Sequence, residues 1–244
     1  LVIPAFNEET RLAAVVESVR RAELGFQIVV VDDGSADRTA EVARALPGVI
    51  LLRHPFNLGY GAAIQTGYKF AARGGATLLA QMDADGQHDP AQLPGMIERV
   101  EAGGADLVIG SRFLSPTGYS MGFAKSAGRR FFQGLARALA GLRVTDPTSG
   151  FQVMNGRVLE LYTRDFFPTD FPDLDILLLA HRAGLRIEEI AVTMAPSPRA
   201  STLHSGLAPA YYLYKMTLSI WAGLGGVDRP ALSAEIPDAG SERP

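Results

Sequence analysis

The stretch Phe-Gln-Ile-Val-Val-Val-Asp-Asp-Gly-Ser, residues 26–35, decides the fold. Its first six residues form a continuous run rich in β-branched side chains, which is typical of a strand covered on both faces. The run ends in two acids, Asp32 and Asp33, and a helix is expected over about residues 36–46, where a Pro-Gly pair stops it. A buried strand therefore leads through an acidic turn into a helix.

The same order of apolar run, polar turn and helix recurs through the first half of the chain. Strands are expected over residues 1–5, 26–31, 49–52, 77–82 and 106–110. Helices are expected around residues 12–19, over 36–46 and 62–72, and after Asp89, which with Pro90 is typical of an N-cap and first helical position. Successive strand–helix units predict an α/β fold with a single, mostly parallel, Rossmann-like sheet and helices on both faces.

The second half of the chain is less regular. Helices are expected over residues 125–139 and 174–183, a turn over 146–150 and a strand over 186–194. We expect one α/β domain over residues 1–206. Residues 207–227 contain one charge and several breaks by proline and glycine, which favours a helix on a membrane surface or packed on the domain rather than a membrane span. The polar residues 228–244 predict a disordered tail.

The composition excludes several classes of protein and site. Hydrophobic residues make up 47% of the 244 residues and charged residues 20%, which argues against a wholly disordered chain. The net charge of −3 gives no sign of a nucleic-acid binder. The chain contains no cysteine and only four scattered histidines, which excludes thiolate ligands and disfavours a multi-histidine zinc site. A bound metal is therefore expected to be a hard cation held by oxygen.

Polar side chains follow the expected strands at the ends where open α/β sheets bind ligands. They are Asn7, Glu8, Asp32, Asp33, Asn57, Asp83 and Asp85. Carboxylates in the turn after the second strand can accept hydrogen bonds from a base imide or a ribose hydroxyl. The alternative is that Ser35 or Asp37 only caps the next helix. The loop at Gly59 and Gly61 matches neither a dinucleotide fingerprint nor a P-loop, so neither of those functions is favoured.

Asp83 and Asp85 are the sharpest candidates for a metal site. Two carboxylates on alternate residues at a strand end can share a divalent cation with a ligand phosphate, because Mg²⁺ uses one or two carboxylates and keeps several waters. Gln87 and His88 follow directly and are candidates for a further ligand or a phosphate contact. The alternative is a surface turn in which Asp89 caps the next helix.

Several short motifs occur in a specific order. They are residues 2–9 (Val-Ile-Pro-Ala-Phe-Asn-Glu-Glu), 30–35 (Val-Val-Asp-Asp-Gly-Ser), Asn57 with Gly59, 83–88 (Asp-Ala-Asp-Gly-Gln-His) and 110–112 (Gly-Ser-Arg). Together they resemble glycosyltransferase family 2, which has the GT-A fold. Residues 146–151 (Asp-Pro-Thr-Ser-Gly-Phe) extend the resemblance to the dolichol- or polyprenyl-phosphate mannose synthase-like branch. The resemblance covers roughly residues 1–195.

The resemblance implies a nucleotide-diphosphate sugar donor, Mg²⁺ or Mn²⁺, and inversion at the anomeric carbon. Residues 1–112 would form the nucleotide-sugar half and residues 113–206 the acceptor half. The donor would lie against Pro4, Ala5, Asn7, Glu8, Asp32, Asp33, Asn57, Gly59, Asp83, Ala84 and Asp85. Asp83, Asp85 and Gln87 would be the metal ligands, and the metal would offset charge on the departing diphosphate.

Basic residues gather on the acceptor side. Arg112 and Lys125 match acceptor-phosphate positions of the mannose synthase-like branch, although the family more often has Arg where Lys125 stands, and Arg129 lies one helical turn further on. A lipid phosphate is already anionic, so it needs cations to hold it rather than a general base. The alternative is a solvated basic start of a helix. Arg199 and Ser201 loosely match a mobile loop that closes over the diphosphate, the alternative being an ordinary surface loop.

Two acids offer a different acceptor chemistry. A hydroxyl acceptor needs a general base, and Asp173 stands where hydroxyl-using members of the family have one, although Pro172 replaces the usual Glu before it. Asp173 can equally be the N-cap of the next helix. Asp146 is a second candidate, with a turn acid before Pro147 as the alternative.

The leading interpretation is transfer of a hexose from a nucleotide sugar to a polyprenyl phosphate. The alternatives are transfer to a glycan hydroxyl with Asp173 as base, and a catalytically silent nucleotide-sugar-binding protein. We expect no nucleic-acid partner, a cytoplasmic protein lying peripherally at the inner face of the membrane, and a membrane-surface or homodimer contact through the apolar residues 207–227.

Overall fold

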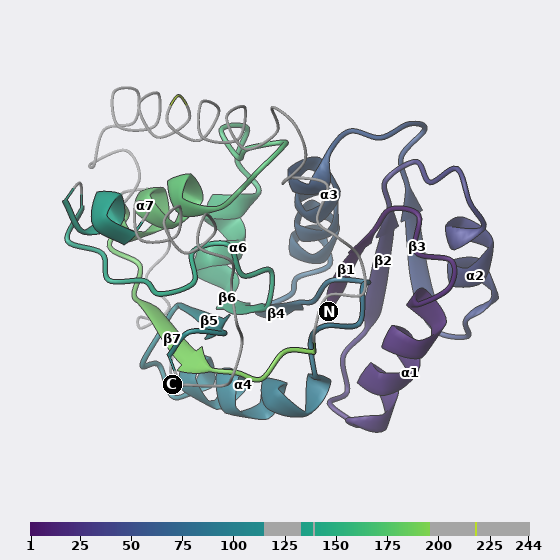
Figure 1. Ribbon diagram of the computed structural model, residues 1–244, viewed down its shortest axis with the longest axis horizontal. Coiled ribbons are helices and arrows are strands. Elements are labelled where there is room, and N and C mark those ends of the chain that lie inside the picture. Colours follow the sequence, from purple (N-terminus) through teal and green to yellow (C-terminus); the bar gives the residue numbers. More distant parts are fainter. Residues whose placement is uncertain (115–132, 139, 196–217, 219–244) are drawn as a thin grey trace.

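The computed structural model describes residues 1–114, 133–138, 140–195 and 218. The strands are β1 (Val2–Ala5), β2 (Ile28–Asp32), β3 (Val49–Arg53), β4 (Leu78–Gln81), β5 (Leu107–Ser111), β6 (Gln152–Asn155) and β7 (Ile187–Ala191). The helices are α1 (Leu12–Arg21), α2 (Thr39–Ala45), α3 (Tyr60–Arg73), α4 (Leu93–Glu101), α6 (Gly156–Tyr162) and α7 (Leu174–Arg182), with a 3-10 turn η1 (Pro90–Gln92) before α4 (Figure 1). Residues 133–138 are also helical.

The described strands form a seven-stranded sheet in the order β3-β2-β1-β4-β6-β5-β7. All neighbouring pairs are parallel except those of β6, which runs antiparallel to β4 and β5. The expected mostly parallel α/β sheet is therefore confirmed. Strand β6 and helix α6 are elements that the sequence patterns did not predict.

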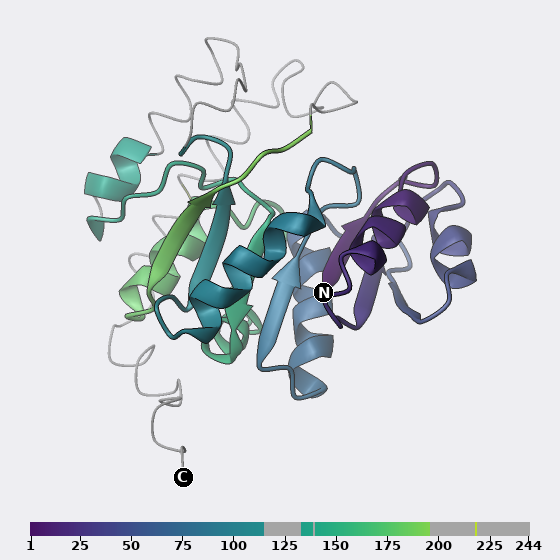
Figure 2. The same ribbon diagram turned by 90° about the horizontal axis from the view of Figure 1, so that it is seen from below.

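The alternation of side chains along each strand divides the core into two layers. Val29, Leu79 and Leu107 face one cluster with α3, α6 and α7, whereas their neighbours Val30 and Ala80 face the other with α1, α2 and α4. In Figure 1, α3, α6 and α7 lie on one side of the sheet and α4 on the other. Figure 2, seen from below, shows the helices α1 and α4 in front of the strands and α3 behind them.

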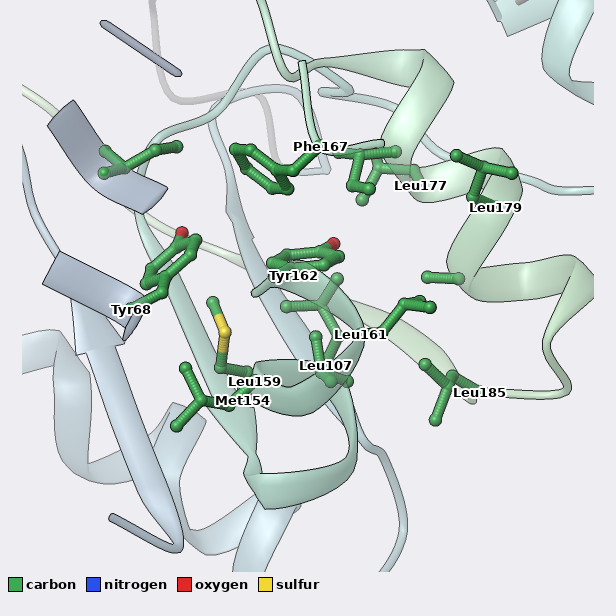
Figure 3. Packing of buried hydrophobic residues seen from close by; sticks show 14 of the residues in the cluster. Tyr68, Leu107, Met154, Leu159, Leu161, Tyr162, Phe167, Leu177, Leu179 and Leu185 are labelled. Carbon is green, nitrogen blue, oxygen red and sulfur yellow. The ribbon is translucent and has the colours of Figure 1, made fainter. Parts of the chain in front are cut away.

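An aromatic group forms the centre of the first layer. The Tyr68 ring of α3 lies 5.8 Å from that of Tyr162 in α6 and 5.9 Å from that of Phe167, between ring centroids (Figure 3). All three side chains are buried. Rings at these separations and inclinations pack favourably, so the group joins α3 to the segment that leads into α7.

Helix α2 begins later than expected, at Thr39 rather than near residue 36. Asp37 accepts hydrogen bonds from the Thr39 amide at 2.9 Å and from the Glu9 amide at 3.2 Å, so residues before Thr39 are used in a turn that contacts the loop after β1. Asp89 does accept a hydrogen bond from the Ala91 amide, which confirms it as a cap, though of the 3-10 turn that precedes α4.

Several expectations lie outside the described residues. They concern Lys125, Arg129, Arg199, Ser201, the apolar stretch 207–227 apart from Leu218, and the tail 228–244. Among the residues that the structure does describe, no helix combines the length and apolar character needed to cross a membrane.

Candidate functional site

The carboxyl ends of the parallel strands meet at one edge of the sheet, and the predicted donor residues lie in the loops there. Pro4 and Ala5 end β1 and are buried, Asp32 ends β2, and Ala84 is buried between Asp83 and Asp85 after β4. Because β6 is antiparallel, the start of this strand, after Phe151, lies at the same edge. Asn57 is exposed in the loop after β3.

Reciprocal hydrogen bonds join the loops after β1 and β2. The Asn7 amide donates to Ser35 Oγ at 2.9 Å, and the Ala36 amide donates to Asn7 Oδ1 at 3.0 Å. Glu8 donates its amide to Thr39 Oγ1 at 2.8 Å. Asn7 has a φ of 56°, a left-handed conformation that asparagine tolerates better than most residues. Hydrogen bonds within the chain therefore fix these two loops relative to each other.

Asp33 organises the loop after β3. Its Oδ1 accepts hydrogen bonds from His54 Nδ1 at 2.7 Å and from the Leu58 amide at 2.9 Å, and its Oδ2 accepts from the Gly59 amide at 3.0 Å. The preceding residue, Asp32, is buried, accepts from the Ser35 amide at 3.2 Å and lies 3.0 Å from Arg53 Nε. Both acids thus hold the edge of the sheet together, and their expected contacts with base and ribose remain predictions.

Close packing accounts for the glycines at the start of α3. A Cβ on Gly61 would lie 2.1 Å from the Pro168 carbonyl oxygen, and one on Gly59 2.8 Å from the Thr169 carbonyl oxygen. The Thr169 oxygen also accepts a hydrogen bond from the Ala62 amide at 2.9 Å. The helix start is therefore occupied by the chain itself, which agrees with the absence of a P-loop pattern.

Asp83 sits among three neighbours. Its Oδ1 accepts a hydrogen bond from the Tyr60 hydroxyl at 2.9 Å, and its amide donates to His88 Nδ1 at 3.1 Å. Burial lowers the pKa of His88 against the charges of Asp83 and Asp85, so the ring is neutral, with its proton on Nε2, 3.8 Å from Asp83 Oδ2. A Cβ on Gly150 would lie 2.8 and 2.9 Å from the two carboxylate oxygens.

Asp85 and Gln87 are in direct contact. The Gln87 amide donates to Asp85 Oδ1 at 3.0 Å, and its side-chain amide donates to Asp85 Oδ2. Asp83, Asp85 and Gln87 are all partly exposed and offer oxygen donors, the kind that Mg²⁺ and Mn²⁺ prefer. The described residues contain no cluster of three or more His, Asp or Glu that could by themselves hold a metal ion. Two carboxylates fit a cation that takes its other ligands from phosphate and water.

Arg112, directly after β5, is held by Asp146. The guanidinium donates from Nε and Nη2 to the two carboxylate oxygens, each at 2.7 Å, and the Arg112 amide donates to Oδ2 at 3.1 Å. Asp146 is fully buried. Its own amide and that of Thr145 donate to the carboxylate of Glu189 on β7, at 2.8 and 2.7 Å. Burial, with the charge of Asp146 adding to it, raises the pKa of Glu189 although these hydrogen bonds oppose the shift.

Asp173 occupies the N-cap position of α7, but its side chain makes no capping hydrogen bond. Asp175 accepts from the Asp173 and Ile176 amides instead, at 3.1 and 2.8 Å. Desolvation of the hydroxyl raises the pKa of Tyr60 well above its ordinary value, although the residue as a whole is 38% exposed, and the charges of Asp83 and, more weakly, of Asp173 add to the shift. Asp173 therefore lies within electrostatic range of Tyr60.

The comparisons with known proteins decide the family. The protein-family model described as "Glycosyl transferase family 2" matches residues 1–161. The chain belongs to glycosyl transferase family 2. It is 30% identical over 239 residues to a polyprenol monophosphomannose synthase of Mycolicibacterium smegmatis, a match that covers 94% of this chain and 88% of the relative. It is 32% identical over 213 residues to an undecaprenyl-phosphate mannosyltransferase of Micrococcus luteus, covering 84% and 86%.

A solved structure agrees on the fold. The glucosyl-3-phosphoglycerate synthase of Mycobacterium tuberculosis, solved with Mn²⁺ and uridine-diphosphate-glucose, superposes with a TM-score of 0.64 and 21% identity, covering 98% of this chain and 79% of that one. The GT-A fold and the resemblance to the polyprenyl-phosphate mannose synthase-like branch are confirmed. The chain is thus a glycosyltransferase rather than a silent binding protein.

Three residues of this glycosyltransferase site escaped the sequence patterns: Tyr60, Gln81 and Glu189. The Gln81 side chain donates to the Tyr60 hydroxyl at 2.8 Å, and Glu189 positions Asp146 from a strand more than forty positions along the chain. One signal was visible for Gln81, a polar residue at the buried end of an otherwise apolar strand. Tyr60 and Glu189 lay in ordinary-looking polar surroundings and gave none.

Proposed function

We propose that the chain transfers a hexose, with inversion and with Mg²⁺ or Mn²⁺, from a nucleoside-diphosphate sugar to a polyprenyl phosphate. The observation that carries the proposal is the Arg112 guanidinium, fixed by two 2.7 Å contacts at the carboxyl end of β5. Arginine binds phosphate well because its planar fork of donors matches the oxygens. The two relatives named for polyprenol- and undecaprenyl-phosphate mannosyl transfer support the same acceptor.

The donor half supplies the site for the diphosphate. Asp83, Asp85 and Gln87 would hold the cation, which when bound offsets negative charge on the leaving diphosphate. The reaction is a single displacement. An acceptor phosphate oxygen forms the new bond to the anomeric carbon while the bond to the diphosphate oxygen breaks, and the nucleoside diphosphate leaves with the electron pair. Attack opposite the leaving group inverts the anomeric configuration.

Arg112 and Asp146 have different roles on the acceptor side. Arg112 would bind and orient the phosphate, which needs no proton removed at neutral pH because it is already ionised. Both oxygens of Asp146 bond the guanidinium, so Asp146 acts best as the group that aims Arg112 rather than as a base. An acceptor on a lipid also places the enzyme at a membrane surface. That surface, the inner-face location and a homodimer contact remain predictions.

A second acceptor is favoured by a separate observation, namely that the charge of Asp173 acts on Tyr60, which donates to Asp83. A carboxylate there could take the proton from a glycan hydroxyl as that oxygen attacks the anomeric carbon. The two functions differ in which residue is indispensable. Asp173 would be required for a hydroxyl acceptor, and Arg112 for a phosphate acceptor.

The test measures transfer from UDP- and GDP-hexoses with MnCl₂ to polyprenyl phosphate and, separately, to an oligosaccharide. Arg112→Gln is expected to abolish transfer to polyprenyl phosphate, whereas Asp173→Asn leaves it near normal. Arg186→Gln, an exposed arginine at the opposite end of the sheet, is the matched control and should not change turnover. The hydroxyl acceptor would instead be established if the wild type transferred only to the oligosaccharide and Asp173→Asn lost that activity.

A further inference from the structure

A chain of hydrogen bonds runs from the buried core to the donor site and ends on Asp83. The Tyr68 hydroxyl donates to Gln81 Oε1, Gln81 Nε2 donates to the Tyr60 hydroxyl at 2.8 Å, and Tyr60 donates to Asp83 Oδ1 at 2.9 Å. Gln81 and Tyr60 each accept at one end and donate at the other, so all three donors point toward the carboxylate. Such chains polarise one another, and each bond is stronger than it would be alone.

The far end of this chain is rigid. Tyr68 and Gln81 are each 1% exposed, and the Tyr68 ring is packed against Tyr162 and Phe167 (Figure 3). The near end is confined from the other side by Gly150, where a Cβ would lie 2.6 Å from the Tyr60 hydroxyl. Asp83 therefore meets a fixed donor on one face and the backbone of the acceptor-side turn on another.

We propose that Tyr60 is a positioning residue: by holding Oδ1 it fixes the rotation of the Asp83 carboxylate, so that Oδ2 is the oxygen presented to the donor's cation. This inference rests on the proposed function, because it assigns Asp83 to the cation of a nucleoside-diphosphate sugar. His88 Nε2 lies 3.8 Å from Oδ2, too far for a hydrogen bond.

The fixed orientation of the Asp83 carboxylate affects which cation the site prefers. The terminal torsion of an aspartate is broad, so an unrestrained carboxylate can turn both oxygens toward a metal. Ca²⁺ accepts bidentate carboxylates and flexible geometry, whereas Mg²⁺ demands near-octahedral ligands at short distance. A carboxylate that is held so that only one oxygen faces the cation therefore favours Mg²⁺ and Mn²⁺ over Ca²⁺. Removing the Tyr60 hydroxyl should loosen this selection as well as weaken binding.

The experiment measures Mn²⁺ binding by electron paramagnetic resonance with the whole chain, in the presence of UDP and, separately, GDP, and then displaces the Mn²⁺ with CaCl₂. Tyr60→Phe is expected to weaken Mn²⁺ binding about tenfold, as is usual when a partner of a metal ligand is removed. In the same variant the Ca²⁺ affinity calculated from displacement should fall less than the Mn²⁺ affinity, so that the preference for Mn²⁺ over Ca²⁺ is smaller than in wild type. Tyr68→Phe, two links further away, should show the same change at a smaller size.

Tyr162→Phe is the matched control, because the Tyr162 hydroxyl is buried next to Tyr68 and has no hydrogen-bond partner within the described structure. It should leave Mn²⁺ affinity and Ca²⁺ displacement unchanged. Gly150→Ala supplies an independent disturbance of Asp83 and should weaken Mn²⁺ binding. Wild-type affinity and selectivity in Tyr60→Phe would overturn the inference. If Asp85→Ala also leaves Mn²⁺ binding unchanged, the donor site of the proposed function fails instead.

Discussion

Asp106 and Asp146 form ion pairs at opposite ends of strand β5. Asp106 directly precedes Leu107, the first residue of the strand, and the partner of Asp146 is Arg112, directly after the last. Both aspartates are almost completely buried, and both bond arginine. Buried acid–arginine pairs are therefore found at both edges of the sheet, and burial with charge pairing does not by itself distinguish a functional residue.

The partners of the two aspartates differ. Asp106 accepts from the Arg186 amide at 2.8 Å, from Asn155 Nδ2 at 2.8 Å and from Arg157 Nη1 at 3.2 Å, and so it joins the starts of β5 and β7 to the end of β6. Asp146 instead directs both oxygens to one guanidinium. The first arrangement gathers backbone elements, while the second fixes one cationic side chain at the edge where ligands bind.

The largest effect is expected from Asp106→Asn on stability. The substitution leaves Arg157 and Arg186 without their carboxylate and should lower the free energy of unfolding by about 3 kcal/mol, within the range for a broken buried pair and reduced by the exposure of Arg186. Urea unfolding measures the change. Turnover per folded molecule at 25 °C should stay at the wild-type value, and a large loss of turnover would show that this edge also serves catalysis.

The same substitution at the other end, Asp146→Asn, is expected to act on turnover. An amide cannot accept both guanidinium bonds, so Arg112 loses its fixed direction and transfer to polyprenyl phosphate should fall about 100-fold, the size seen when a charge-stabilising donor is lost. This corresponds to about 2.7 kcal/mol in the activation barrier. Initial rates at saturating donor measure it.

The matched pair separates aiming from folding. Asp146→Asn should also lose stability. Its turnover is therefore compared with that of Asp106→Asn under conditions in which urea unfolding shows both variants to be fully folded. If Asp146→Asn keeps the wild-type turnover per folded molecule, Asp146 contributes only to the fold, and the positioning of Arg112 is not what the pair provides.

The comparison also shows what the sequence could predict. Asp83 and Asp85 were predictable because the carboxyl ends of parallel strands lie at one edge, whatever the details of packing. Strand β6 was not, because four residues give too little alternation to see, and its antiparallel partner β4 ends more than seventy positions earlier. Side-chain partners were not predictable either. Nothing in the order of residues shows that three donors from the chain itself would bond Asp33.

The partner of Arg112 illustrates the same limit. Asp146 and Arg112 were both candidates on the acceptor side, one as a base and one as a phosphate ligand, and only their 2.7 Å contacts show that they act on each other. Local patterns report which residue types occur at a strand end. They do not report which of them pair, because pairing depends on contacts between residues far apart in the chain.

The smallest effect is expected in the acid range and again concerns Asp106. Burial alone would raise the pKa of this carboxyl, but its hydrogen bonds from Arg186 and Asn155 and the nearby arginine charges outweigh burial, so the pKa is lowered in the folded protein. A lowered pKa means that the stabilisation is present above the ordinary value of about 3.9 and is lost as pH falls through the folded value.

The stability difference between wild type and Asp106→Asn should therefore be constant from neutral pH to about pH 5 and should shrink below about pH 4. Thermal unfolding of both proteins across this range measures it, and the other carboxylates cancel because both proteins carry them. Tyr162→Phe, which removes no group that titrates in this range, should keep a constant difference from wild type. If the stability difference for Asp106→Asn also stayed constant, the charge of Asp106 would not be what stabilises the contact between β5, β6 and β7. Hydrogen bonds that do not depend on this charge would then account for the stabilisation.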